Sequence, residues 1–110
     1  METRRDVFQA IADPTRRAII HLLSQQSMNL NSVADNFEIS RPAISKHIRI
    51  LTECGLVTIR QKGRVRYCNA NLQPLNEVSA WVKQYRKFWN GRLDALEELL
   101  KSDLDTDKQQ

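Results

Sequence analysis

In the middle of the chain, apolar positions follow the period of a helix that ends at a glycine. Ile44, Ile48 and Leu51 recur at i, i+4 and i+7, which places them on one buried face. Ser40 can accept a backbone hydrogen bond as the N-cap, and Gly55 can supply the left-handed residue that ends a helix. The opposite face is polar and largely cationic, and carries Arg41, Ser45, Lys46 and Arg49. The pattern predicts an amphipathic helix with a cationic outer face.

After this helix the pattern changes to the alternation that is typical of strands. The first strand alternates two apolar residues, Val57 and Ile59, with polar ones. The second strand alternates Val65 and Tyr67 with a set that comprises Arg64, Arg66 and Cys68. The strands meet at a tip of Lys62-Gly63-Arg64, so we predict a hairpin. We expect its apolar face to pack on the helices and its other face to present the arginines.

Three shorter helices are predicted to precede the cationic one. Thr3 can cap the first, with Asp6 in the capping-box position. Asp13 can cap the second, whose first turn holds Pro14 at a position where a missing N–H costs little. Asn31 can cap the third, which is short and leads through a tight turn into the cationic helix, giving a helix-turn-helix. A connector before Asn31 is predicted to be a loop or a short third strand.

A long apolar stripe marks the C-terminal third of the chain. Its members are spaced three or four residues apart and are Leu75, Val78, Val82, Tyr85, Trp89, Leu93, Leu96 and Leu100. The spacing predicts one helix from about Leu72 or Pro74 to Lys101, with Gly91 as a point where it can kink. A chain of 110 residues offers no internal groove of that length, so part of the stripe is expected to face a second copy. The alternative is a helix packed wholly inside one domain.

The positive charge is concentrated on the predicted helix and hairpin. Seven Lys and Arg and a single Glu lie between residues 41 and 66, a net of +6, although the whole chain carries only +4. A local basic surface of this kind is typical of proteins that contact nucleic acids. A solvated helix face is the alternative, and the adjoining basic hairpin favours DNA. We expect one domain over residues 1–101 and a polar tail over residues 102–110.

Several other classes of protein are disfavoured. No apolar run approaches the roughly 20 residues of a membrane span, and the N-terminal residues lack the apolar segment of a signal peptide. The two cysteines have no metal-like spacing and fit a reducing compartment, so we expect a cytoplasmic protein. The sequence offers no nucleophile-base-acid set and no Gly-rich phosphate loop. We therefore expect neither an enzyme nor a bound cofactor.

The Ser-x-Pro-x-Ile-Ser-x-His-Ile-x-x-Leu-x-x-x-Gly-Leu-Val pattern of residues 40–57 resembles the recognition helix of the ArsR/SmtB family of small dimeric winged-helix repressors. The resemblance extends to Ala12-Asp13-Pro14-Thr15-Arg16-Arg17 and to Gly63-Arg64 with Tyr67, and covers about residues 5–100. It implies a mainly α fold with a small β-hairpin, in the order α-α-α-α-β-β-α, that forms a winged helix-turn-helix homodimer. It also implies a repressor of transcription whose operator is an inverted repeat in double-stranded DNA.

The resemblance and the charge pattern together assign roles to residues. Those expected in the DNA groove are Arg41, Pro42, Ser45 and Lys46. Those expected at phosphates or in the minor groove are Arg49, Lys62, Arg64 and Arg66. In the family the first and last helices form the dimer interface, so the residues expected there are Phe8, Ile11, Tyr85, Trp89, Leu93 and Leu96. A competing interpretation is a dimer whose basic face docks an acidic partner protein.

Many members of this family sense metals, and this chain departs from their ligand pattern. The positions of their Cys-Val-Cys thiolates fall on Asn29 and Asn31, and the last predicted helix contains no histidine. We therefore expect no metal site. Family members without the ligands include autorepressors silenced by sequestration on a partner protein, and the sequence leaves open whether a regulatory partner protein acts on this chain.

Two residue types leave alternatives open. His47 lies beside the predicted DNA-facing surface, where it can contact a base or bond locally within the protein. Cys68, on the strand face with the arginines, is a better candidate for a redox-active thiol than Cys54, which follows a helix C-terminus. Two inert thiols are the favoured interpretation.

Overall fold

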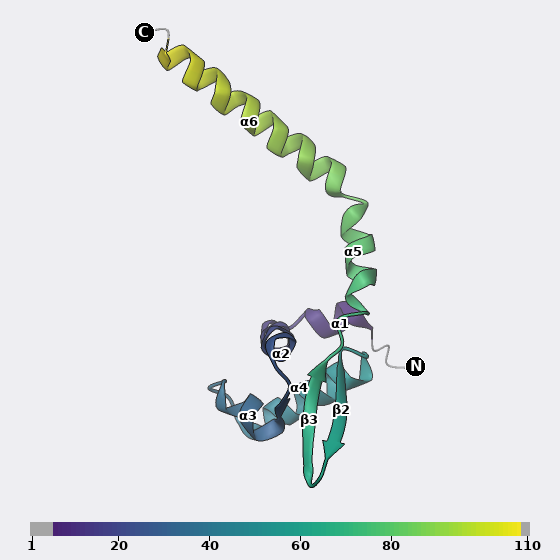
Figure 1. Ribbon diagram of the computed structural model, residues 1–110. Coiled ribbons are helices and arrows are strands. Elements are labelled where there is room, and N and C mark those ends of the chain that lie inside the picture. Colours follow the sequence, from purple (N-terminus) through teal and green to yellow (C-terminus); the bar gives the residue numbers. More distant parts are fainter. Residues whose placement is uncertain (1–5, 109–110) are drawn as a thin grey trace. The chain divides into compact units, whose positions relative to one another are not determined.

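The computed structural model describes residues 6–108, with side chains described through Asp103. Its elements, shown in Figure 1, are α1 (Val7–Ile11), α2 (Pro14–Gln25), β1 (Met28–Asn29), α3 (Leu30–Asp35), α4 (Arg41–Glu53), β2 (Val57–Lys62), β3 (Val65–Ala70), α5 (Leu75–Lys83) and α6 (Arg86–Lys108). The chain divides into two compact units, the first ending at Val78 and the second beginning at Ser79. The first holds α1 to β3 and the start of α5, and the second holds the rest.

The core of the first unit lies between three helices and the inner end of a small sheet. Its largest fully buried side chains are Ile19, Val33, Ile44, Leu51, Leu56 and Val57. They come from α2, α3, α4 and the start of β2, except for Leu56, which directly precedes β2. Helix α4 packs against α2, α3 and β2. Burying each such side chain stabilises the fold by roughly 1.5–3 kcal/mol. This packing fixes α4 and gives a winged helix-turn-helix, as predicted.

The sheet has three antiparallel strands in the order β1-β3-β2, so the expected short third strand is present at Met28–Asn29. Its register corrects the predicted faces of the hairpin. Ile59 lies opposite Cys68 and Val57 opposite Ala70, and directly opposed residues share a face. Cys68 is 3% exposed, whereas Val65 is 37% exposed. The prediction that Val65 and Tyr67 share the packed face with Val57 and Ile59 is therefore wrong.

Two of the predicted helix starts also differ. The side chain of Asp6 is the N-cap of α1 and accepts from the Gln9 N–H, while Thr3 lies outside the described residues. Asn29, rather than Asn31, caps α3, and its Oδ1 accepts from the Ser32 N–H at 2.8 Å. Asn29 ends β1 and has extended backbone angles, as an N-cap requires, whereas Asn31 already lies inside the helix.

Helix α4 begins and ends as its sequence predicts. The hydroxyl of Ser40 accepts from the Ala43 N–H, and Gly55 has a φ of +79°. The Leu56 N–H donates to the Leu51 carbonyl at 2.9 Å, and the Gly55 N–H donates to the Thr52 carbonyl at 3.1 Å. This pair of bonds is the Schellman motif, which satisfies the last carbonyls of the helix.

The single long C-terminal helix was a wrong prediction, because the chain forms two helices joined at Gln84–Tyr85. At the joint the Tyr85 N–H donates to the Val82 carbonyl, an i→i−3 bond that replaces the α-helical ladder. No residue of low helix propensity explains this break. Gly91 lies inside α6 and causes no interruption, and α6 continues past Lys101 to Lys108, since no Gly or Pro follows to end it.

The boundary between the two units, at Val78 and Ser79, divides the predicted apolar stripe. Leu75 and Val78 pack against the core of the first unit. The members from Val82 onward, including Trp89 and Leu93, are exposed in the single chain. In residues 6–108, no helix is both long and apolar enough to cross a membrane.

Candidate nucleic-acid interface

Helix α4 presents one polar face to solvent. Arg41, Pro42, Lys46 and Arg49 are exposed, and Ser45 is partly exposed. Ile44, Ile48 and Leu51 hold the opposite face in the core. Because the buried face fixes the rotation of the helix, the predicted groove residues all lie on its outer side, toward its N-terminal half.

The hairpin of β2 and β3 carries the remaining predicted contacts. In Figure 1 it extends from the helices of the first unit as a two-stranded arm. Its two-residue tip is Gly63-Arg64, and only Gly63 has a positive φ, of +65°, which is the geometry of a type II′ turn. Lys62 pairs with Val65, and Gln61 pairs with Arg66, so Lys62 and Arg66 lie on opposite faces of the arm. The arm therefore presents cations from both faces and from its tip.

These lysine and arginine side chains have no protein partner within the part of the chain that the structure describes. Among residues 6–108, none of the lysine and arginine side chains of α4, β2, β3 or their tip forms an ion pair or donates a hydrogen bond to the protein. Their guanidinium and ammonium donors therefore remain available for phosphate oxygens or base edges.

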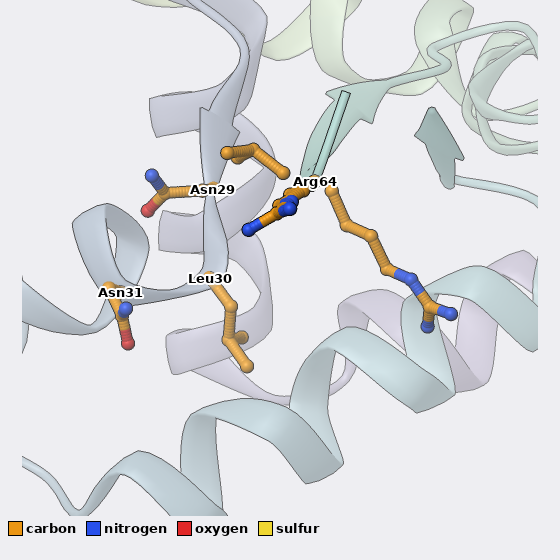
Figure 2. A pocket seen from close by; sticks show the side chains of 6 residues that line it. Asn29, Leu30, Asn31 and Arg64 are labelled. Carbon is orange, nitrogen blue, oxygen red and sulfur yellow. The ribbon is translucent and has the colours of Figure 1, made fainter. Parts of the chain in front are cut away.

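A pocket of about 370 Å³ lies between the start of α3 and the hairpin, and is lined by Asn29, Leu30, Asn31, Arg64, Val65 and Arg66. Figure 2 shows the two asparagines and Arg64 around this space. Asn29 and Asn31 stand where the resembling family places its thiolates. Here one amide caps α3, and two arginines share the pocket with them. Amides and guanidinium groups form a poor donor set for a transition-metal cation.

Other potential metal ligands do not gather either. Within residues 6–108, no three His, Cys, Asp or Glu side chains come together in a way that could hold a metal ion. Cys68 faces the core and not the solvent, and burial raises the pKa of its thiol. The idea that Cys68 is the better redox candidate is therefore wrong, because a buried neutral thiol is a poor nucleophile.

Arg16 is a functional candidate that the sequence reasoning missed. Its Nε donates to the Ala10 carbonyl at 2.8 Å, and its Nη2 donates to the Gln9 carbonyl at 3.0 Å. Its Nη1 lies 3.4 Å from Nδ1 of His47, on the recognition helix. The sequence signal for Arg16 was the match of residues 12–17 to the family pattern. Its contacts could not be predicted from the sequence, because they are made with α1 and α4.

Asp13 completes this cluster at the start of α2. Its Oδ2 accepts from the Arg16 N–H at 2.9 Å and lies 3.9 Å from Nδ1 of His47. The pKa of the Asp13 carboxyl is lowered, chiefly by the Arg16 N–H bond and further by the charges of His47 and Arg16, although desolvation opposes the shift. The side chain of His47 is 19% exposed. Within the protein, the His47 ring therefore contacts two residues at the start of α2, far away in the sequence.

The predicted dimer residues fall into two groups. Phe8 and Ile11 belong to the first unit and are partly buried against its core. Tyr85, Trp89, Leu93 and Leu96 belong to the second unit, where each is about half exposed or more. Tyr85 and Trp89 contact the neighbouring rings of Trp81 and Phe88, and the described residues leave the rest of this second group in water.

Residues 13–58 match the model of the family described as "Bacterial regulatory protein, arsR family". The chain is 36% identical over 80 residues to the transcriptional repressor SdpR of Bacillus subtilis, which is 73% of this chain and 89% of that protein. It is 34% identical over 98 residues to the arsenic resistance transcriptional regulator ArsR1 of Pseudomonas putida, 88% of this chain and 71% of that protein.

A solved structure has the same fold. The crystal structure of the ArsR family transcriptional regulator RHA00566 matches with a TM-score of 0.66 and 36% identity. The match covers 76% of this chain and 86% of that one. The matched family segment, residues 13–58, contains α2, α3 and α4 and reaches the start of β2.

Proposed function

This chain belongs to the arsR family of bacterial regulatory proteins and is a DNA-binding transcriptional regulator, and from this premise we propose that it is a homodimeric repressor of an inverted-repeat operator. The observation that carries the proposal is the cationic surface of α4 and the β2–β3 arm, whose lysine and arginine side chains are exposed and form no ion pair with any residue that the structure describes. A surface of this kind supplies phosphate contacts, and a helix beside it can enter the major groove. The comparisons lend no support to a module that docks an acidic protein.

We assign the two parts of this surface different tasks. The outer side of α4 enters the major groove with Arg41, Pro42, Ser45 and Lys46, because these side chains lie near the N-terminal end of a recognition helix. Arg49 and the arm residues Lys62, Arg64 and Arg66 contact phosphates or the minor groove. The first group determines sequence preference, and the second group supplies affinity that is independent of sequence.

Dimerisation follows from the apolar residues of α6. Trp89, Leu93 and Leu96 lie on one side of this helix and are exposed in the single chain. Monomeric proteins rarely leave so large an apolar stripe in water, so a second copy is the proposed cover. Two copies place two recognition helices about one DNA turn apart, which fits an inverted repeat.

We further propose that DNA binding does not respond to transition metals. The support is the donor set at the family's thiolate positions, where Asn29 and Asn31 share a pocket with Arg64 and Arg66. Release from DNA is then expected to depend on a regulatory partner protein. Because bacterial DNA lies in the cytoplasm, we expect the protein there.

The test of the DNA proposal uses duplexes that the wild-type protein selects from a random pool, with scrambled duplexes as controls. Binding to the selected duplex should fall with salt at a log–log slope of about −5 to −7, as six to eight phosphate contacts per dimer require. Ser45→Ala with Lys46→Ala should reduce discrimination between the two duplexes, whereas Arg64→Ala should weaken both about equally. Failure to enrich any sequence would defeat the repressor proposal.

The test of the metal proposal repeats the binding measurement with stoichiometric zinc, copper or arsenite. Affinity for the selected duplex should be unchanged. An Asn29→Cys, Asn31→Cys double variant provides the comparison, because it restores thiolates at the two positions. Tight zinc binding by the wild-type chain, with release of DNA, would overturn the proposal.

A further inference from the structure

The Arg16 guanidinium joins three elements at one point in the first unit. Two of its nitrogens donate to the carbonyls of Gln9 and Ala10, near the C-terminal end of α1. Its third nitrogen, Nη1, reaches His47 of α4 across 31 positions of sequence. Because Arg16 itself lies in the first turn of α2, one side chain connects α1, α2 and α4. Arg17, its neighbour, donates to the Ile11 carbonyl, has no second partner among the described residues and remains exposed.

The chemistry of the contact determines the state of the imidazole. A guanidinium has donors and no acceptor, so the 3.4 Å contact is a hydrogen bond only when His47 Nδ1 accepts it. The proposed bond therefore requires the ring tautomer that carries its proton on Nε2. The Asp13 carboxylate, at 3.9 Å, is beyond hydrogen-bond distance of the same nitrogen and already accepts from the Arg16 N–H.

We propose that Arg16 and His47 form a positioning contact that sets the recognition helix against α1 and α2, so that Arg16 governs sequence discrimination without touching DNA. His47 adjoins Ser45 and Lys46, the proposed base-contacting residues, so a shift of α4 at His47 moves them directly. The inference rests on the proposed DNA-binding function. In this proposal, His47 Nδ1 binds Arg16 within the protein and does not contact a DNA base.

The first test compares two neighbouring arginines. Arg16→Lys keeps the charge, but one ammonium cannot reproduce the fork that bonds two carbonyls and an imidazole together. We expect it to lower affinity for the selected duplex on the order of tenfold, the scale of one lost base contact, with little change for a scrambled duplex. Arg17→Lys is the matched control and should leave both affinities unchanged. Equal losses on both duplexes for Arg16→Lys would overturn the proposal.

The second test uses the different reach of two amides at position 47. The Oδ1 of an asparagine occupies about the place of His Nδ1, whereas the Oε1 of a glutamine lies nearer the place of Nε2. His47→Asn should therefore retain discrimination, and His47→Gln should lose it. The opposite result would show that Nε2 contacts a base and that the positioning contact is wrong. His47 is partly exposed, so neither change removes a core side chain.

The third test detects the contact between Arg16 and His47 in the absence of DNA. The chain has two histidines, and long-range nitrogen–proton NMR correlations report which ring nitrogen is protonated in each. At a pH where both rings are neutral, His47 should be protonated on Nε2 in the wild type and should lose this preference in Arg16→Lys. A ring protonated on Nδ1 would overturn the proposal. If no duplex is ever enriched, the proposed function fails, and this spectrum still decides whether the contact exists.

Discussion

At the scale of single residues, burial decides the chemistry of Cys68. Its side chain lies in the sheet opposite Ile59 on one strand and Met28 on the other. Burial raises the pKa of the Cys68 thiol, because a thiolate would lose its hydration there. Since the thiolate is the reactive form, the folded protein should protect this residue.

We predict that Cys68 reacts slowly with an aromatic disulfide reagent. In a Cys54→Ala variant, native Cys68 should react on the order of tenfold or more slower than after unfolding in urea, because reaction must await local opening. The Cys68→Ala variant is the control, since its remaining thiol at Cys54 is only partly buried. Equal native and unfolded rates for Cys68 would contradict the placement of this side chain.

Asp13 gives a prediction about pH. The pKa of its carboxyl lies below the ordinary value of 3.8, so the ionised form stabilises the folded state. The stabilisation by ionised Asp13 is complete when the pH is above the ordinary carboxyl pKa. It is lost as the pH falls through the lower pKa that the carboxyl has in the folded state. Asp13→Asn keeps an N-cap without the titration. The difference in unfolding free energy between wild type and variant should be constant near neutral pH and narrow in acid. A difference that widens in acid would reverse the assigned sign.

At the scale of the elements, two glycines have opposite roles in their helices. Gly55 ends α4 with a φ of +79°, a conformation that side-chain-bearing residues rarely adopt. A Cβ there would meet Pro74 Cγ at an ordinary 3.7 Å, so the backbone angle and not crowding opposes substitution. Gly91 lies inside α6 with nothing within 4 Å of an added Cβ.

The two alanine substitutions should therefore change stability in opposite directions. Gly55→Ala is expected to destabilise the protein by about 1–2 kcal/mol through left-handed strain. Gly91→Ala is expected to stabilise α6 by about 0.5–1 kcal/mol, because glycine loses more freedom in a helix. Urea unfolding followed by circular dichroism measures the first, and the thermal loss of helical signal measures the second. A stabilising Gly55→Ala would show that α4 does not end in the described motif.

At the scale of the whole molecule, the proposed interface lies on α6. Leu93 is 60% exposed in the single chain, in the middle of the side that also carries Trp89 and Leu96. Lys87 lies on the opposite side of the same helix, from the helical period. In a dimer, a charge at position 93 would be buried without a partner, whereas a charge at position 87 would stay in water.

We expect Leu93→Asp to give a monomer that no longer binds the selected duplex, since burying an unpaired charge costs several kcal/mol. Sedimentation at micromolar concentration should give a mass near 12.8 kDa for this variant and about twice that for the wild type. Lys87→Asp should remain a dimer. A dimeric Leu93→Asp variant would place the interface on another stripe.

The sequence by itself determined those features that depend on neighbours a few residues apart. The cap at Ser40, the buried stripe from Ile44 to Leu51 and the turn at Gly63 all follow from local hydrogen bonds, helical period and allowed φ angles. The sequence also predicts the concentration of positive charge on α4 and the arm, because both elements come from one continuous segment. These features predicted the helix-turn-helix, the hairpin and their cationic surface, and the resemblance to the ArsR/SmtB family implied the winged helix-turn-helix fold.

Only the tertiary structure decided features that depend on distant partners. Which strand face is buried depends on the pairing of Ile59 with Cys68, and alternation alone cannot choose between two faces. The break at Gln84–Tyr85 has no local signal, since the apolar period continues through it. The bond between Arg16 and His47 joins residues 31 positions apart. In each case the outcome depends on packing and on donor positions that exist only once the helices and strands have come together.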